Sequence, residues 1–360
     1  MAPPRLPLLA GMTRDDLTRF AAECGQPRFR AAQLGDWIFG KHIVDPDQMT
    51  NLPAAFRQAL QEHFLAPASH VAAADRSEDG TEKLLLRLYD GESVEMVLIP
   101  SEERMTFCLS TQVGCPVRCR FCASGADGLR RNLLCGEIIE EFTSGIARAG
   151  QVPDNLVFMG IGEGLLNFEE LSKALLLLTA PEGYGLSPRR ITVSTSGIVP
   201  GIAKLAALGK EFTLAISLHA VNDELRSRLI PDFCRYPVAE ILRAVDDYRE
   251  TTGRMPTFEY TLLDGVNDSL TDAAELGRLS RRHHAKINLI PYNPTDSEFR
   301  RPSRERIRDF ARAVERAGGK VTVRKERGSE GTAACGQLRR QKNSSSSGDS
   351  CASSGESAGQ

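Results

Sequence analysis

From residue 105 onward, short apolar segments of strand-like composition alternate with segments in which apolar residues recur at helical spacing. This alternation is typical of α/β proteins in which each parallel strand is followed by a helix. The predicted strands are residues 105–112, 155–159, 191–194, 212–219, 257–263, 286–291 and 320–324, and the predicted helices are 134–149, 168–179, 238–251, 270–283 and 303–317. A parallel α/β barrel, or part of one, explains this order better than an open doubly wound sheet, although the sequence barely separates the two.

The segments on either side of this region follow other patterns. Residues 12–65 predict a small helical unit that begins at Thr13, with the acidic pair Asp15-Asp16 in its first turn. Alternating apolar residues at 83–100 around Asp90-Gly91 predict a β-hairpin, and the Ser/Gly-rich composition after Leu338 predicts disorder. We therefore expect a helical domain at 1–66, a β-hairpin extension at 67–104, a barrel domain at 105–340 and a disordered tail at 341–360.

Composition restricts the classes of function. A formal net charge of -2 gives no overall attraction to nucleic acid, so any such contact has to come from local groups of arginines. The strongest apolar run, Ala174 to Leu178, is far shorter than the roughly 20 residues of a membrane span, and residues 1–11 do not resemble a secretory signal. Nine unevenly spaced cysteines disfavour a disulfide scaffold. We expect a soluble, cytoplasmic protein with no membrane contact.

Three cysteines follow the first strand of the barrel region, at Cys115, Cys119 and Cys122. Three thiolates on one short loop can hold a [4Fe–4S] cluster and leave its fourth iron open to a small molecule. A structural zinc site is the alternative, but it would normally need a fourth cysteine or histidine nearby, and the next one, Cys135, begins a predicted helix. The spacing therefore favours the cluster.

Polar residues follow four of the predicted strands, at 160–163, 194–197, 217–219 and 292–293. In a parallel barrel the carboxyl ends of all strands meet at one rim, where ligands bind. Glycine at position 162 would let the backbone approach a ligand, and Glu163 could accept a hydrogen bond from an ammonium group. Ser194, Ser217 and Asn293 could bond ribose or carboxylate oxygens. Each of these groups of polar residues alone has a simpler interpretation, such as a helix-capping turn or a histidine in the core.

The cysteine spacing, with Phe121 before the last cysteine, resembles the signature of radical S-adenosylmethionine (SAM) enzymes. Further segments are similar to the RlmN/Cfr family of RNA methyltransferases, and closest to its RlmN branch, from the helical unit through Leu338. They are Cys108-Leu109-Ser110-Thr111-Gln112-Val113-Gly114-Cys115, Arg131-Asn132-Leu133, Met159-Gly160-Ile161-Gly162-Glu163, Ser217-Leu218-His219-Ala220 and Ala333-Ala334-Cys335-Gly336-Gln337-Leu338. The resemblance implies a partial (β/α)6 TIM-like barrel.

The resemblance also implies roles for individual residues. The cluster ligands would be Cys115, Cys119 and Cys122, and the SAM contacts would be Gly162, Glu163, Ser194, Ser217, Leu218, His219 and Asn293. Cys335 would carry a methyl group, Cys108 would resolve the product through a transient Cys108–Cys335 disulfide, and Glu95 would accept a proton. A solvated position on the hairpin is the alternative reading of Glu95.

The implied activity is radical methylation of carbon 2 of an adenine in 23S ribosomal RNA and in transfer RNA, with two SAM molecules used per turnover. The resemblance further implies a reductant of the flavodoxin or ferredoxin type and a monomeric enzyme. Methylation of carbon 8, as in Cfr, is the enzymatic alternative, because Gly164 stands where RlmN members usually have proline. A non-catalytic RNA-binding metalloprotein is the alternative from another class.

RNA binding would rest on arginines, several of them around the presumed active rim. The candidates are Arg28, Arg30, Arg118, Arg120, Arg130, Arg131, Arg189, Arg190, Arg300, Arg301, Arg304, Arg306 and Arg308. Each alone would more often belong to a solvated surface.

Overall fold

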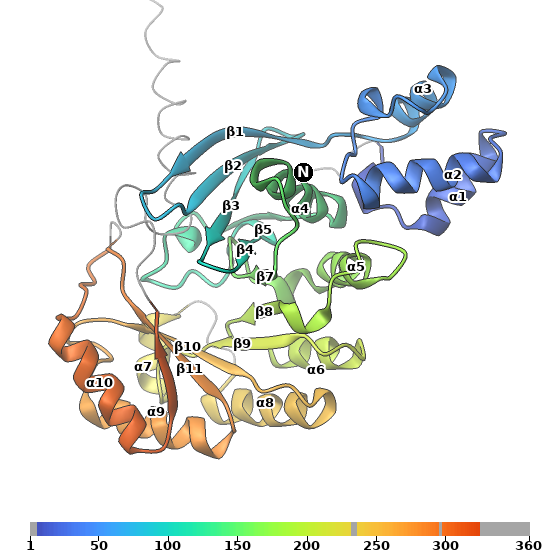
Figure 1. Ribbon diagram of the computed structural model, residues 1–360. Coiled ribbons are helices and arrows are strands. Elements are labelled where there is room, and N and C mark those ends of the chain that lie inside the picture. Colours follow the sequence, from blue (N-terminus) through green and yellow to red (C-terminus); the bar gives the residue numbers. More distant parts are fainter. Residues whose placement is uncertain (1–5, 232–235, 295–296, 325–360) are drawn as a thin grey trace, which may run out of the picture.

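A computed structural model describes residues 6–231, 236–294 and 297–324. The N-terminal unit contains helices α1 (Arg14–Glu23), α2 (Arg28–Gly35) and α3 (Ala54–His63), with the short helices η1 (Leu9–Gly11), η2 (Asp36–Gly40) and η3 (Pro46–Gln48). Helix α1 begins as predicted, because the Thr13 hydroxyl accepts the Asp16 N–H while the Asp16 carboxylate accepts the Thr13 N–H. Figure 1 shows this unit projecting to one side of the main body.

Ten strands form one sheet, in the order β1-β2-β3-β4-β7-β8-β9-β10-β11-β12. Strands β1 (Ser69–Arg76), β2 (Glu82–Leu88), β3 (Ser93–Pro100) and β4 (Met105–Cys108) are antiparallel neighbours. From β4 onward the neighbours are parallel: β7 (Asn155–Phe158), β8 (Ile191–Thr195), β9 (Thr213–Ser217), β10 (Thr257–Leu262), β11 (Lys286–Pro291) and β12 (Lys320–Val323). Among the described strands of this sheet, β1 and β12 are the two open edges, which agrees with the expected partial barrel.

The helices lie around the outside of the curved sheet (Figure 1). They are α4 (Cys135–Ala149), α5 (Phe168–Thr179), α6 (Val199–Ala207), α7 (Asp223–Leu229), α8 (Val238–Thr252), α9 (Leu270–Arg282) and α10 (Arg304–Arg316), with the short helices η4 (Ala123–Gly125), η5 (Gly164–Asn167) and η6 (Pro188–Arg190). The predicted helices at 134–149, 168–179, 238–251, 270–283 and 303–317 are confirmed within two residues at each end. Their apolar faces pack on the sheet and on one another, which fixes the strand ends in space.

The structure differs from the sequence-based prediction at several elements. Residues 105–112 are not one strand: β4 ends at Cys108, and a separate ribbon of β5 (Gln112–Gly114) and β6 (Leu129–Asn132) follows. The hairpin at 83–100 is confirmed as β2 and β3, but β1 lengthens it to a meander. Strand β1 is rich in alanine and mostly exposed, and α7 is short and polar, so neither has an apolar repeat that would predict it.

Two apolar clusters organise the interior. The larger runs from the N-terminal unit through the sheet to α10, and the unit joins it where Phe39 and His42 contact Tyr184, which in turn contacts Phe142. The smaller lies under the cysteine loop and contains Val117, Phe121, Ala220, Leu225, Leu229, Ile230, Leu263 and Tyr292. The three cysteines of the loop pack against this second cluster, which supports them from below. No helix in the described ranges is both long and apolar enough to cross a membrane.

Candidate functional site

The cysteine loop connects β5 to β6, and its three thiols open into one cavity of about 200 Å³. Backbone hydrogen bonds hold the loop: the Cys115 N–H donates to Gly128, and the Cys122 N–H donates to Cys119. Glycine is required at position 114, where φ is 78° and a Cβ would collide with the Gly128 carbonyl. The local sequence therefore places all three cysteines on one short, tightly turned segment.

The donor set fits an iron–sulfur cluster. Burial raises the pKa of the Cys115 thiol to about 12 and that of Cys119 well above its usual value, and the neighbouring thiols add to both effects. Without a metal the thiols therefore stay protonated. Three thiolates are stable here only beside positive metal ions, which lower the pKa of the thiols that bind them. Within the part of the chain that the structure describes, no three His, Cys, Asp or Glu side chains surround one point as a single zinc ion would need. A cluster that takes each thiolate on a different iron suits this arrangement better.

The polar strand ends share the cavity with the cysteines, as the barrel geometry predicted. The cavity is lined by Cys115, Val117, Cys119, Phe121, Cys122, Phe158, Met159, Gly160, Gly162, Glu163, Ser194, Thr195, Ser196, Ser217, His219, Glu259, Ile290 and Arg324. Two other predicted SAM contacts are not among the described lining residues: Leu218, which is fully buried, and Asn293, which is half-buried beyond β11. Their roles stay predictions.

Glu163 is held by the backbone around it. Its carboxylate accepts the Ser196 N–H at 2.6 Å and the Leu165 N–H at 3.2 Å, and only 3% of the residue is exposed. Burial raises the pKa of Glu163, while the hydrogen bonds from Ser196 oppose this. The preceding Gly162 has φ 118°, and a Cβ there would lie 2.7 Å from the Thr111 Oγ1. Glycine at 162 thus lets the turn after β7 pack against residues 111–112 and present Glu163 to the cavity.

His219 is both a buried histidine and a cavity residue. Its Nδ1 accepts the Thr261 N–H at 3.0 Å, which leaves the proton of the neutral ring on Nε2. Burial, assisted by the charge of Arg226, lowers the pKa of His219 to about 3. The ring of Phe121 from the cysteine loop meets it edge-on with centroids 4.8 Å apart. The imidazole is therefore a neutral group beside the loop that carries the cysteines.

Two polar residues of this region were missed in the sequence. Arg226 of α7 is 2% exposed and donates to the carbonyls of Ser196, Ser217 and Leu218 at the ends of β8 and β9. Its charge also opposes the rise in the pKa of Cys119 that burial causes. Glu259 lies in β10 and lines the cavity. A single charged residue within an otherwise uncharged strand was a signal for Glu259. Arg226 gave no such signal, because it lies in a polar helix whose pattern is typical of a solvated surface.

Cys108 and Glu95 lie on the same face of adjoining strands. Cys108 of β4 pairs with Val97 of β3, and Glu95 is two residues from Val97, so strand alternation points all three the same way. Their neighbours Met96 and Phe107 point toward Gly145 of α4, so Glu95 and Cys108 face away from that helix. Glu95 is 2% exposed, so the alternative of a solvated strand position is wrong. Cys335 lies outside the described residues.

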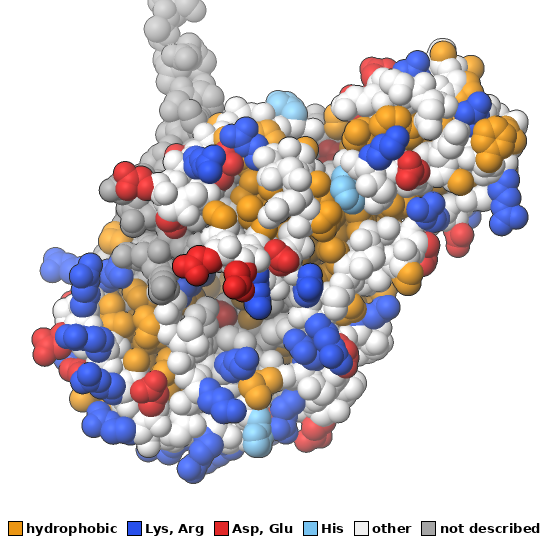
Figure 2. All heavy atoms as spheres, viewed as in Figure 1, with side chains coloured by type: hydrophobic (Ala, Val, Ile, Leu, Met, Phe, Trp, Pro, Cys, Tyr) orange, Lys and Arg blue, Asp and Glu red, His pale blue; other side chains and the backbone are white. Residues whose placement is uncertain are grey.

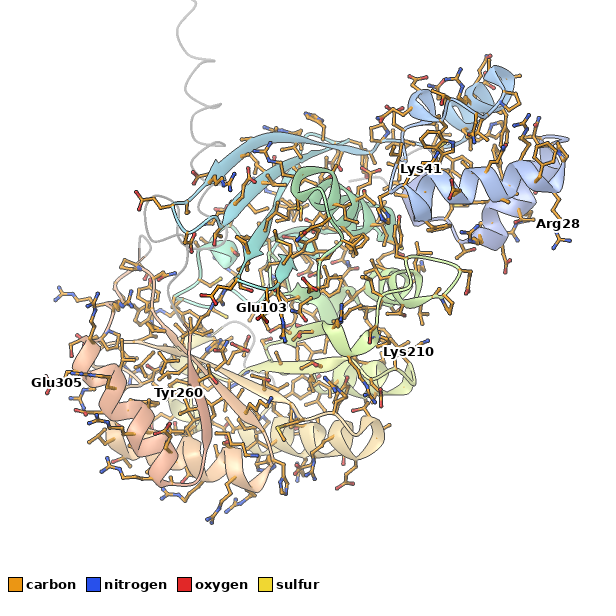
Figure 3. The ribbon with its side chains drawn as sticks, in the orientation of Figure 1. Arg28, Lys41, Glu103, Lys210, Tyr260 and Glu305 are labelled. Carbon is orange, nitrogen blue, oxygen red and sulfur yellow. The ribbon has the colours of Figure 1, made fainter. Side chains whose placement is uncertain are left out.

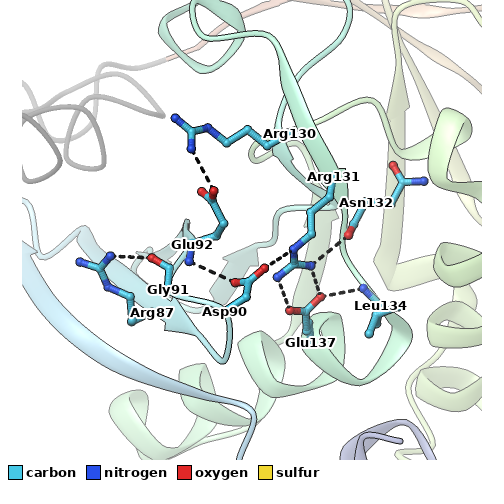
Figure 4. Close-up of polar contacts among 9 residues, drawn as sticks. All are labelled: Arg87, Asp90, Gly91, Glu92, Arg130, Arg131, Asn132, Leu134 and Glu137. Carbon is cyan, nitrogen blue, oxygen red and sulfur yellow. Dashed lines mark hydrogen bonds and ion pairs between the residues drawn. The ribbon is translucent and has the colours of Figure 1, made fainter. Parts of the chain in front are cut away.

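Arg131 of β6 is a structural residue rather than a free contact for RNA. Figure 4 shows its guanidinium bonded to both oxygens of Glu137 at 2.8 Å and to Asp90 at 2.7 Å. Glu137 also accepts the Leu134 N–H at the start of α4. These bonds raise the pKa of Arg131 further and tie the β2–β3 turn to α4. The neighbouring Arg130 pairs with Glu92 and stays exposed.

Other arginines remain on the surface. Figure 2 shows Lys and Arg side chains spread over the lower part of the main body, and Figure 3 shows Arg28 at the outer end of the N-terminal unit. Arg189 is bonded to Glu211 through two nitrogens, and Arg120 pairs with Glu298 at 2.6 Å. Cys119 and Cys122 also line a second hollow of about 320 Å³ together with Arg118 and Arg120. The cysteine loop therefore has a basic surface as well as the polar cavity.

Comparisons with known proteins agree with this geometry. The sequence matches the radical SAM superfamily over residues 109–277 and the ribosomal RNA large subunit methyltransferase N-terminal domain over residues 8–65. It is 43% identical to a probable dual-specificity RNA methyltransferase RlmN of Akkermansia muciniphila, covering 96% of this chain and 99% of the relative. It is 43% identical to the dual-specificity RNA methyltransferase RlmN of Marinobacter nauticus, covering 92% of each. The crystal structure of a radical SAM methyltransferase from Sphaerobacter thermophilus superposes with a TM-score of 0.88, at 43% identity and over 92% of this chain and 98% of that one.

Proposed function

The chain belongs to the RlmN family of radical SAM RNA methyltransferases, and we propose from this that it methylates carbon 2 of an adenine in 23S ribosomal RNA and in transfer RNA. The observation that carries the proposal is the single cavity shared by three cysteines and the polar ends of β7, β8 and β9. Carbon 2 of adenine is electron-poor and does not attack a sulfonium methyl group directly, so a radical route is needed.

The cofactors of the proposed reaction are a [4Fe–4S] cluster held by Cys115, Cys119 and Cys122, and SAM. When bound, the cluster supplies the electron that cleaves a carbon–sulfur bond of SAM. Glu163 would orient the methionine ammonium group, because its carboxylate is fixed by two backbone N–H groups and lines the same cavity as the cysteines. Gly162, Ser194, Ser217, Leu218, His219 and Asn293 would complete the SAM site.

Three further residues would handle the methyl group. Cys335 would take a methyl group from one SAM by displacement and carry it to the base, and a second SAM would be cleaved to activate that methyl group. The radical adduct formed with the base would lose one electron, returned to the oxidised cluster, and Glu95 would accept the proton lost from the ring. The Cys108 thiolate would then attack the Cys335 sulfur, so that a disulfide forms and the released carbon takes up a proton to become the methyl group. The common face of Glu95 and Cys108, turned away from α4, supports placing them together on the substrate side.

The RNA would be held by the N-terminal unit and by arginines near the rim. In the N-terminal unit Phe29 is 55% exposed, and Arg28 and Arg30 stand on either side of it in the sequence. An exposed aromatic ring beside cations can stack on an unpaired base while the cations contact phosphates. The target adenine would be unstacked to reach the cavity.

The remaining partners are proposed on chemical grounds. A flavodoxin- or ferredoxin-type protein would supply the electron, and the second hollow, lined by two cluster cysteines together with Arg118 and Arg120, would suit its acidic surface. We propose a monomeric enzyme that works in the cytoplasm, where its RNA substrates are made.

Mass spectrometric mapping of methyladenosine isomers tests the proposed reaction. The reconstituted enzyme, given SAM, a reductant and either ribosomal or transfer RNA, should produce 2-methyladenosine in both. The Cys335→Ala variant should produce none. Formation of 8-methyladenosine would assign the Cfr-type reaction instead, and absence of any methylated adenine with an intact cluster would contradict the proposal.

A further inference from the structure

Glu259 is a buried acid in the cavity that has no role so far. It is 6% exposed and lies on β10, where its register partners are Ser217 of β9 and Asn288 of β11. The next residue, Tyr260, is labelled in Figure 3, and its ring packs on Phe310 of the outer helix α10. Strand alternation therefore points Glu259 inward. The Ser194 and Ser217 hydroxyls lie 3.5 Å apart on the adjoining strands. Ser194, Ser217, Glu259 and Asn288 thus form a polar row across β8 to β11.

The Glu259 carboxylate has spare capacity to accept hydrogen bonds. Among the described residues it accepts one, from the Asn288 amide at 2.7 Å, although an ionised carboxylate offers about four acceptor sites. Burial raises the pKa of Glu259 to about 7, and the Asn288 bond and the charge of Arg324 oppose this. Buried polar groups are nearly always satisfied, so an acceptor that lines a cavity and has one donor indicates that a ligand supplies the others.

Two other buried acids show how the protein itself can satisfy a buried carboxylate. Glu163 in the same cavity accepts two backbone N–H groups. Glu140 of α4 accepts the Ala68 N–H at 2.8 Å and the Ser69 hydroxyl at 2.7 Å, and burial raises its pKa to about 7 as well. Glu140 lies outside the cavity and its carboxylate is bonded by the protein. Burial, a raised pKa and a single donor therefore do not separate Glu259 from structural acids, because Glu141 of α4 is fully buried and one of its carboxylate oxygens has no partner among the described residues. The position of Glu259 in the wall of the cavity does separate it.

The position of Glu259 along the rim indicates which part of a bound SAM molecule it would contact. Glu163 follows β7, beside the cysteine loop, and β10 lies three strands further, roughly 14 Å along the sheet. A SAM molecule whose amino-acid end lies at the cluster and Glu163 would extend along this rim, and its next hydrogen-bond donors are the two ribose hydroxyls. A carboxylate accepts from such a diol with two charge-assisted bonds, as acids of dinucleotide-binding folds do.

We propose that Glu259 binds the ribose hydroxyls of SAM, with Asn288 holding its carboxylate in position. The assignment rests on the proposed function, because it takes SAM as the occupant of the cavity. It makes Glu259 a determinant of specificity for the ribose, distinct from the serines on β8 and β9.

The test measures binding of S-adenosylhomocysteine, an unreactive probe, and of its 2′,3′-dideoxy analogue to the cluster-loaded protein by anaerobic calorimetry. The wild type should prefer the probe with hydroxyls, and Glu259→Gln should weaken binding of that probe by about 10- to 100-fold. Binding of the dideoxy analogue should change little, because the lost contact is already missing from it. Glu140→Gln is the matched control, an equally buried acid outside the cavity, and should leave both affinities unchanged.

Three results would overturn the assignment. An equal loss of affinity for both ligands in Glu259→Gln would show that Glu259 contacts a part of SAM other than the ribose hydroxyls, or that it only supports the fold. Unchanged affinity for both, or a wild type that does not distinguish them, would show that the ribose hydroxyls are not bound there. A wild type that binds neither ligand would overturn the proposed function and this assignment with it, whereas the first two results would leave the proposed function intact.

Discussion

The N-terminal unit and the cavity at the strand ends bury different kinds of side chain. Between residues 6 and 68 every buried side chain is apolar or absent, and the charged residues stay at the surface. The cavity region buries Glu163, His219, Arg226 and Glu259. Burying such groups costs free energy unless they are bonded, and several of them around one cavity indicate a site for a ligand or for chemistry, whereas Glu140 is bonded by the protein itself. The comparison assigns the chemistry to the barrel and leaves surface recognition to the N-terminal unit.

The largest effect should come from the cysteine loop. Cys119→Ser should remove the brown absorbance of the cluster and all formation of 5′-deoxyadenosine, because three thiolates are needed to hold one cluster. Cys24→Ser, which changes a half-buried cysteine of the N-terminal unit, should retain both. Absorbance and chromatography of the cleavage products measure the two outcomes. Cleavage of SAM by the Cys119→Ser variant would contradict the assignment of the cysteine loop as the cluster site.

Glu163→Gln should weaken binding of S-adenosylhomocysteine by about 10- to 100-fold, since a charged hydrogen bond to the ammonium group is worth about 1.5–3 kcal/mol. The amide would also turn an N–H toward one of the two backbone donors that the carboxylate now accepts. Glu240→Gln on α8 is the control and should bind normally. Calorimetry on the cluster-loaded proteins measures the affinity of each for S-adenosylhomocysteine. Equal affinities for the wild type, Glu163→Gln and Glu240→Gln would show that Glu163 does not contact SAM.

His219 should make stability depend on pH in a defined direction. Its folded pKa of about 3 lies below the usual 6.5, so the unfolded chain binds the extra proton and stability falls as pH drops from 6.5 toward 3. At pH 5 the loss from this group is roughly 2 kcal/mol. His219→Asn keeps a residue that tolerates the positive φ of 57° and should remove this part of the slope.

The measurement is urea unfolding of wild type and variant without the cluster, at pH 5 and pH 8. Only the difference between the two proteins is informative, because other buried groups also make stability depend on pH. The folded pKa values of Glu140 and Glu259 are raised to about 7, so the stability that these two acids contribute falls as pH rises, opposite to the effect of His219. A difference that does not change with pH would mean that the pKa of His219 is the same in the folded and unfolded protein, which would contradict its lowering by burial.

The smallest effect should come from the N-terminal surface. Arg28→Glu should raise the KM for RNA by about 3- to 10-fold and reduce the salt dependence of binding by about one ion, while SAM cleavage without RNA stays unchanged. Arg243→Glu on the exposed side of α8 makes the same charge change and should have no effect. A point substitution is sharper than deleting the unit, because deletion would expose the Tyr184 and Phe142 rings that Phe39 and His42 contact. An equal KM for RNA in Arg28→Glu and Arg243→Glu would show that this surface of the N-terminal unit does not contribute to RNA recognition.

The sequence predicted most of the parallel strands and five of the helices, because apolar residues there recur at periods of two and 3.6. It also predicted that Gly162, Glu163, Ser194, Ser217 and His219 share a rim with the cysteines, since parallel strands end together. It could not show that Glu95 is buried or that Arg226 of a polar helix reaches three carbonyls, because both depend on which elements pack above them. Arg131 looked like an RNA contact until its partners Asp90 and Glu137 were in place.

The covalent route through Cys335 and Cys108 can be tested by trapping its last step. In Cys108→Ala the methyl group should still reach Cys335 and add to the adenine, but the product cannot be released without the second thiol. Cluster-loaded Cys108→Ala, given SAM, reductant and RNA, should therefore accumulate a protein–RNA species that survives denaturation, and mass spectrometry should place the link on Cys335. Normal turnover by this variant, or a link on another residue, would contradict the mechanism proposed for this chain.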